Sequence, residues 1–331
     1  MKNHSNRPYA ACAGCKTINY AAMSARERAT GVKSGTLGYV MRRTIRQFDV
    51  VGRARMKEIY LSTLKSFLAF RNGNDVYLDD INADMIMQYE KYLHTSRGVS
   101  RNTSSFYMRV LRAVYNRAVG EGLATDCRPF KHVYTGVDKT LKRALPLSVI
   151  KKILQLDLSH RPKVAFARDL FMFSFYTRGM SFVDMAYLRK NDLKNGVLTY
   201  RRRKTGQVLH IKWEKCMQEF IAKHGSGTGG YLLPIIKAGN SDERSQYQRA
   251  ICLTNLYLKE VGRMVGLSVP LTTYVARHSW ANIAKCKHVP LSVISEGMGH
   301  ESEKTTRIYL ASFEHSVVDK ANSVVIKALF G

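Results

Sequence analysis

The chain has 331 residues, long enough for two domains of ordinary size, and 45% of them are hydrophobic, which argues against a largely disordered protein. It carries 53 Lys and Arg against 25 Asp and Glu, a formal net charge of +28, so we expect a polyanionic partner, most commonly nucleic acid. The alternative is a merely soluble basic protein. No run of about 18 apolar residues occurs, which excludes a membrane-spanning helix.

The basic N-terminus is followed by no apolar segment of the signal-peptide kind, so we expect a cytoplasmic protein. The cysteines favour the same reducing setting, because six of them are scattered along the chain without the pattern of a disulfide scaffold. Cys12 and Cys15 form one CxxC pair. A second pair with metal-ligand spacing is missing, so the sequence predicts no metal site.

Residues 1–34 are polar and small, and we expect a flexible N-terminal extension there. Over 35–126 apolar residues recur at helical spacing, which predicts an all-helical domain. Asn82 stands where it could cap the helix that follows it. Three polar residues lie on one face of its last helix and are candidates for DNA binding: Arg109, Arg112 and Asn116.

A basic stretch with little pattern covers 127–145 and reads as a linker. The segment KVAFARDLFMFSFY (163–176) then predicts a buried helix. The β-rich runs VLTYRRRK and QVLHIKW flank Thr205-Gly206, which predicts a hairpin with a two-residue turn. With further helical segments up to the apolar stripe of 316–330, the expected class is mainly α with a small β-sheet (α+β).

Five side chains in the second module could together handle a phosphate: Arg178, Lys204, Arg277, His300 and Tyr309. Phosphoryl transfer needs cations and hydrogen-bond donors at the phosphate oxygens, a proton donor for the leaving oxygen, and a nucleophile for a covalent route. Each residue taken alone has a simpler reading, since a tyrosine at helical spacing is usually a core aromatic.

Four ordered motifs resemble those of the tyrosine site-specific recombinases, the phage-integrase family: FYTRGMSFVDMAYL (175–188), RRKTGQVLHI (202–211), YVARHSWAN (274–282) and GHESEKTTRIY (299–309). The resemblance covers nearly everything from residue 35 onward. It implies a helical, SAM-like core-binding domain over 35–126 and a catalytic domain over 146–331. The expected activity is the cleavage and rejoining of DNA for integration, excision or inversion.

The resemblance also implies residue roles. Tyr309 would attack the scissile phosphorus and form a 3′-phosphotyrosyl link, and Lys204 would give a proton to the leaving 5′-oxygen. Arg277 would clamp the non-bridging oxygens, and His300 would bind the phosphate or assist proton transfer. Neither a metal nor any other cofactor is expected. Arg201 and Arg203, beside Lys204, are further candidates for DNA binding.

The chain departs from the family pattern at two positions. Tyr274 stands where the family has a His, and it keeps one hydroxyl donor but no charge. Ser181 stands where the family has its first Arg, three residues before Asp184. Arg178 lies three residues earlier, and on a continuing helix it would share the face of Ser181 and could reach the same phosphate.

The RGMSFVDM box resembles the branch of the family found in mobile elements and invertible-DNA systems. The resemblance implies double-stranded DNA as partner, a homotetramer held together by a C-terminal oligomerisation helix, and accessory DNA-bending proteins as an option. Two other functions stay open: a catalytically degenerate DNA-binding protein of the family and a type IB-like topoisomerase.

Overall fold

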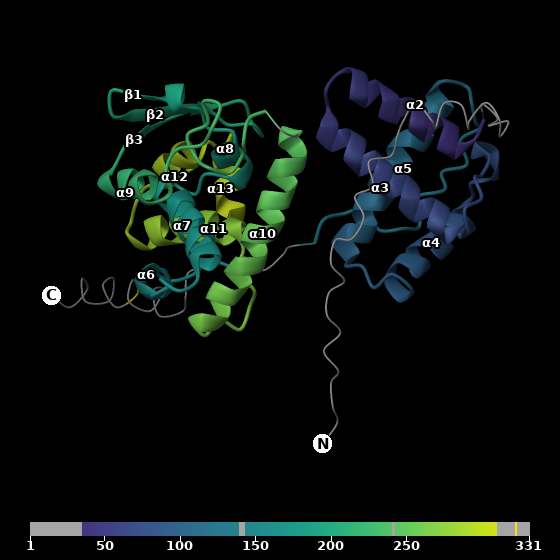
Figure 1. The fold of residues 1–331 in the computed structure, drawn as a ribbon. Helices are drawn as coiled ribbons and strands as arrows, with labels where there is room; N and C mark the ends of the chain where they lie inside the picture. Colours follow the sequence, from purple (N-terminus) through teal and green to yellow (C-terminus); the bar gives the residue numbers. More distant parts are fainter. Residues whose placement is uncertain (1–34, 139–142, 240–241, 310–321, 323–331) are drawn as a thin grey trace. The chain divides into compact units, whose positions relative to one another are not determined.

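The structure is a computed structural model that describes residues 35–138, 143–239, 242–309 and 322 (Figure 1). The chain divides into two compact units at Lys139. The expected N-terminal extension, with Cys12 and Cys15, lies outside the described residues, and so does nearly all of the expected C-terminal helix. Among the described helices, none combines the length and the apolarity that crossing a bilayer requires.

The first unit is helical, as its hydrophobic spacing predicts. Its elements are α2 (Leu37–Val50), α3 (Ala54–Phe70), the 3-10 turn η1 (Leu78–Asp80), α4 (Ala83–Thr95) and α5 (Arg101–Gly120). The expected cap is confirmed, because the Asn82 side chain accepts a hydrogen bond from the N–H of Met85 at 2.9 Å. The helices share one core, in which the rings of Phe67, Tyr89 and Tyr115 are fully buried.

Most of the stretch expected to be a linker packs onto this first unit. Phe130 and Val133 are buried in its core. The side chain of Asn102, on α5, donates to the main-chain oxygen of Asp138 at 3.0 Å and accepts from its N–H at 2.7 Å. Residues up to 138 therefore continue the helical unit, whereas the sequence places its end at residue 126.

The second unit surrounds one helix in which every residue from Val164 to Tyr176 is buried or half-buried. Its helices are α6 (Leu147–Gln155), α7 (Pro162–Tyr176), α8 (Phe182–Ala186), α9 (Lys215–His224), α10 (Glu243–Met264), α11 (Thr273–Cys286), α12 (Leu291–Met298) and α13 (Glu303–Tyr309), with the 3-10 turn η2 (Lys190–Asp192). Phe173 of α7 packs into the cluster that contains the sheet, and Phe171 packs into the cluster with α10 and α11. The buried helix expected at 163–176 is confirmed, since this helix lies between two cores.

The small sheet has three antiparallel strands in the order β1 (Leu193–Lys194), β2 (Val197–Arg201) and β3 (Val208–Lys212). Arg201 pairs with Val208, so six residues, 202–207, connect β2 to β3. The predicted two-residue turn is wrong, because the strands end at Arg201 and Val208. The N–H of Arg202 donates to the carbonyl oxygen of Gln207 at 2.7 Å, but neither residue belongs to a strand. The fold class is confirmed as mainly helical with a small sheet.

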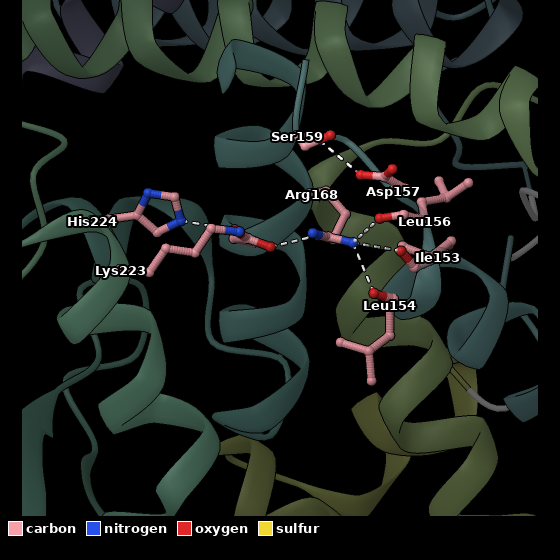
Figure 2. Close-up of polar contacts among 9 residues, drawn as sticks. Ile153, Leu154, Leu156, Asp157, Ser159, Arg168, Lys223 and His224 are labelled. Atoms are coloured by element: carbon pink, nitrogen blue, oxygen red, sulfur yellow. Dashed lines mark hydrogen bonds and ion pairs between the residues drawn. The ribbon is translucent and has the colours of Figure 1, made fainter. Parts of the chain in front are cut away.

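One charged cluster interrupts the apolar surface of α7 (Figure 2). Arg168 is buried and donates to the carbonyl oxygens of Ile153, Leu154 and Leu156 at the end of α6. Asp169 accepts from Arg168 and, at 2.8 Å each, from two residues of α9, Lys223 and His224. Burial raises the pKa of Asp169, but these hydrogen bonds and the charge of Arg168 outweigh it and hold the pKa below its usual range. The cluster ties α6, α7 and α9 together.

Candidate active site

Arg277 is the centre of the candidate site. It lies one turn into α11 and is 2% exposed. Its Nη1 donates to the carbonyl oxygen of Gly179 at 2.9 Å, and its Nη2 donates to the carbonyl oxygen of Met298 at 2.6 Å. One guanidinium thus joins the turn that follows α7 to the end of α12.

The turn after α7 contains two successive residues with left-handed backbones. Arg178 has φ 59° and Gly179 has φ 73°, so the helix does not continue and α8 begins at Phe182. The expectation that Arg178 and Ser181 share a helical face is therefore wrong. A Cβ at Gly179 would lie 2.5 Å from the Cα of Arg277, which explains the glycine.

The Arg178 side chain nevertheless lies beside the site. It is half-buried, and its Cδ would lie 3.6 Å from a Cβ built on Gly297 of α12. A second observation comes from Tyr200 of β2, which is buried. Burial raises the pKa of this phenol, the charge of Asp184 raises it further, and the charges of Arg277, Arg202 and Arg178 lower it. Three arginines thus act on one buried ring.

Ser181 serves as the N-cap of α8. Its hydroxyl lies 3.4 Å from the N–H of Asp184 and donates to the Asp184 carboxylate at 2.6 Å. The same carboxylate, which is 5% exposed, accepts from the main-chain N–H of Arg203 at 2.9 Å. Asp184 therefore ties the β2–β3 loop to the start of α8, a contact that the sequence analysis did not foresee.

His300 is buried between Arg277 and α13. Its Nε2 accepts from Arg277 Nη2 at 2.9 Å, and its Nδ1 lies 2.8 Å from the hydroxyl of Thr306. Because an arginine can only donate, these bonds assign a neutral ring with its proton on Nδ1. Burial and the charges of Arg277, Arg202 and Lys204 lower the pKa of His300 to about 4, so the ring stays neutral at pH 7.

Thr306 links this network to the helix that carries Tyr309. The threonine is fully buried in α13. Tyr309 is the last residue of that helix, about one turn further on. The side chain of Tyr309 lies outside what the structure describes. Thr306 belongs to the motif GHESEKTTRIY, but the sequence alone does not single it out as a site residue.

The β2–β3 loop brings Lys204 to the same turn. Lys204 is exposed, while two of its neighbours bond to the main chain beside His300. Arg202 donates to the oxygen of Gly299, and Gln207 donates to the oxygen of His300 at 3.3 Å. Arg202 was not among the predicted site residues, although strand alternation after the buried Leu198 and Tyr200 places it on the inner face.

The remaining candidates have different surroundings. Arg201 and Arg203 are exposed: Arg201 donates to the oxygen of Gly206 at 2.6 Å, and the guanidinium of Arg203 lies 3.7 Å from the ring centre of Tyr187. Tyr274, in the first turn of α11, is 43% exposed, and its ring lies edge-on to His278.

The polar candidates of the first unit lie along α5. Arg109 and Asn116 are exposed, and Arg112 is half-buried and donates to the hydroxyl of Thr135 at 3.1 Å. Over the described residues, no three His, Cys, Asp or Glu side chains form a group that could hold a metal ion.

Comparisons with known proteins agree on one fold and one set of relatives. Residues 37–133 match the phage integrase SAM-like domain. The chain is 22% identical over 279 residues to a tyrosine recombinase of Pseudothermotoga lettingae, a match that covers 80% of this chain and 90% of the relative.

Two solved structures have the same fold. The Tn1549 transposon integrase in complex with a circular intermediate DNA superposes with a TM-score of 0.61 at 16% identity, over 89% of this chain and all of that one. A lambda integrase tetramer bound to a Holliday junction gives a TM-score of 0.60 at 18% identity, over 88% of this chain and 85% of that one.

Proposed function

We propose that this chain, a tyrosine recombinase, cleaves and rejoins DNA strands at specific sites through a covalent 3′-phosphotyrosyl intermediate. The family rests on the integrase-type match of the first unit and on relatives that align along most of their length. The observation that carries the chemistry is the hydrogen-bonded chain from Arg277 through His300 to Thr306, which leads to the helix that ends in Tyr309.

These positions support the following reaction. The phenol oxygen of Tyr309 attacks the phosphorus, the bond from phosphorus to the 5′-oxygen breaks, and Lys204 gives that oxygen its proton. The proton of the phenol leaves to a base, and neutral His300 can accept it through Nε2 once a phosphate oxygen takes over the N–H of Arg277. A free 5′-hydroxyl reverses the step. One phosphodiester bond is exchanged for another, so the reaction needs no external energy source. We therefore propose, as the sequence predicts, that it uses no cofactor.

Arg178 is our candidate for the second cation at the phosphate. Its stem lies along Gly297, and its charge acts on Tyr200 together with that of Arg277. Two cations suit the charge that spreads over the phosphate oxygens in the transition state. Ser181 fits this role less well because its hydroxyl is bonded to Asp184. In the proposed reaction, Tyr274 would add one hydroxyl donor.

Double-stranded DNA is the proposed partner. The net charge of +28 supports it, and the exposed or half-exposed candidates for contact are Arg109, Arg112, Asn116, Arg201 and Arg203. A lambda integrase forms a tetramer on a Holliday junction and a transposon integrase binds a circular intermediate DNA, so we extend the proposal to a homotetramer that serves a mobile or invertible element. Accessory DNA-bending proteins and a cytoplasmic location belong to the same proposal. So do a core-binding role for the first unit, which extends to residue 138, and a catalytic role for the second unit.

Covalent trapping tests the function. The protein is mixed with nicked fragments of the DNA that flanks its coding region, and denaturing gels are run for protein-linked DNA. We expect an adduct with wild type and with Tyr257→Phe, a matched change on α10, and none with Tyr309→Phe, which should still bind the fragment. An adduct that survives in Tyr309→Phe would move the nucleophile elsewhere. Binding without any wild-type adduct would favour a degenerate DNA-binding protein, and relaxation of any supercoiled plasmid would favour a topoisomerase.

A further inference from the structure

We infer that Arg202 is a positioning residue that holds the Lys204 loop on the Gly299–His300 turn. One contact would then set the distance between the proton donor and the histidine. The inference rests on the proposed function, because Lys204 acts as a proton donor only in that reaction.

Contacts between the loop and the turn carry the inference. Nη1 of Arg202 donates to the oxygen of Gly299, and the hydroxyl of Thr205 reaches the same oxygen at 3.4 Å. Gln207 donates to the oxygen of His300 at 3.3 Å. Lys204 follows Arg202 and precedes Thr205 and Gln207 in the sequence, and its side chain is exposed. The loop is thus fastened on both sides of the residue that must be placed.

Gly299 makes the close approach possible. It caps α12 with φ 64°, in the left-handed region. A Cβ at this position would lie 3.3 Å from Cδ of Arg202, 3.2 Å from Oε1 of Gln207 and 3.0 Å from Cδ1 of Leu209. The loop therefore packs directly against the backbone of the turn, and its position depends on that of His300.

Stability alone does not account for an arginine at position 202. The side chain is 4% exposed, and its Nε is buried without a hydrogen-bond partner. Burying a charge with an unmatched N–H is costly, and an apolar side chain of similar volume is often at least as stabilising. The charge of Arg202 also acts on the site. Burial lowers the pKa of His300, and the charges of Arg277, Arg202 and Lys204 lower it further.

The neighbouring arginines do not share this position. Arg201 bonds within the loop, and Arg203 covers the ring of Tyr187. Both are exposed, whereas Arg202 continues the inward face of Leu198 and Tyr200. Of the three successive arginines, Arg202 is thus the one placed to control the loop.

A change of leaving group separates positioning of Lys204 from contact with phosphate. Replacing the bridging 5′-oxygen by sulfur gives a thiolate leaving group. A thiol has a pKa of about 8.5, whereas the pKa of an alcohol is close to that of water, about 15.7. The sulfur substrate therefore needs no proton donor. Rates lost because Lys204 is misplaced return on sulfur, but rates lost because a phosphate contact is missing do not.

The experiment measures single-turnover cleavage of the trapped fragment, made with oxygen or sulfur at the scissile bond. For Arg202→Gln we expect a loss of about 100-fold on oxygen, the scale of general acid catalysis, and less than about 5-fold on sulfur. Arg202→Lys should recover part of the oxygen rate. Lys212→Gln, an exposed charge change at the far end of β3, is the control and should match wild type on both substrates.

Equal losses on the two substrates would overturn the inference and make Arg202 a phosphate contact, and a wild-type rate on oxygen would overturn it as well. If Arg202→Gln does not fold, Gln207→Ala removes the other anchor and should show the same rescue by sulfur. Failure of the proposed function looks different, because wild-type protein itself would then form no Tyr309-dependent adduct.

Discussion

At the scale of single residues, the absence of a side chain at Gly179 allows α11 to pack closely enough for Arg277 to bond to the turn after α7. The glycine combines a left-handed backbone with an approach of 2.5 Å between a would-be Cβ and the Cα of Arg277. We predict that Gly179→Ala costs about 3 kcal/mol or more, because backbone strain and overpacking add. Urea unfolding followed by tryptophan fluorescence measures this, since Trp213 and Trp280 both belong to the second unit.

Gly196 provides the matched control for this prediction. Its φ is 72°, almost the same as that of Gly179, but a Cβ there would meet nothing within 4 Å. Gly196→Ala should therefore cost only the backbone part, about 1 kcal/mol. Equal losses in the two variants would mean that the contact with Arg277 contributes nothing.

The sequence could propose Arg277, His300, Lys204 and Tyr309 because motif order and spacing are visible without coordinates, and their roles stay predictions. It missed Arg202 and Thr306 for a physical reason. Their importance comes from contacts with the turn at Gly299 and with the ring of His300, which only folding brings near. The expected helical face shared by Arg178 and Ser181 is wrong, since two left-handed residues in a row cannot be read from a segment that continues a helical pattern.

At the scale of elements, the order of apolar residues predicted α7 and its burial well. The length of the β2–β3 loop was not predictable from its turn residues, because the loop bonds to Gly299, a residue that is distant in sequence. The end of the first unit was missed for a similar reason: 127–138 has no helical period, yet Phe130 and Val133 fill the core of that unit.

The charged cluster on α7 gives a prediction at this scale. Asp169→Asn should lower the free energy of unfolding by about 3–5 kcal/mol, because it leaves the buried Arg168 without its counter-ion. Lys223→Gln should cost at most about 1 kcal/mol, since Lys223 is 54% exposed. Unfolding of the two variants in urea at pH 7 compares them directly. Similar small losses would show that the cluster does not hold α6 and α9 to α7.

The depressed pKa of Asp169 fixes the sign of the pH dependence. A carboxyl that is more acidic in the folded state stabilises the fold above its unfolded pKa, about 3.9, and loses that contribution as the pH falls through the folded value. The gap between wild type and Asp169→Asn should therefore be full at pH 7 and narrow only under strongly acidic conditions.

At the scale of the whole molecule, the excess of positive charge predicts how DNA binding responds to salt. If six to ten phosphates are neutralised, affinity should fall by about 10³- to 10⁵-fold between 50 and 200 mM salt. Fluorescence anisotropy of a labelled duplex measures this with the full chain. An affinity that is nearly independent of salt would exclude an electrostatic DNA partner and leave the charge of +28 without the role proposed here.

The bonds of Arg277 also determine when the candidate site can form during synthesis. Its guanidinium bonds to residue 179, which lies 98 positions earlier, and to residues 298 and 300, more than 20 positions later. A ribosome-bound chain that stops before Met298 has nothing to complete this network, and position 309 comes later still. A partly translated chain therefore lacks this network, which forms only after nearly all of the second unit has left the ribosome.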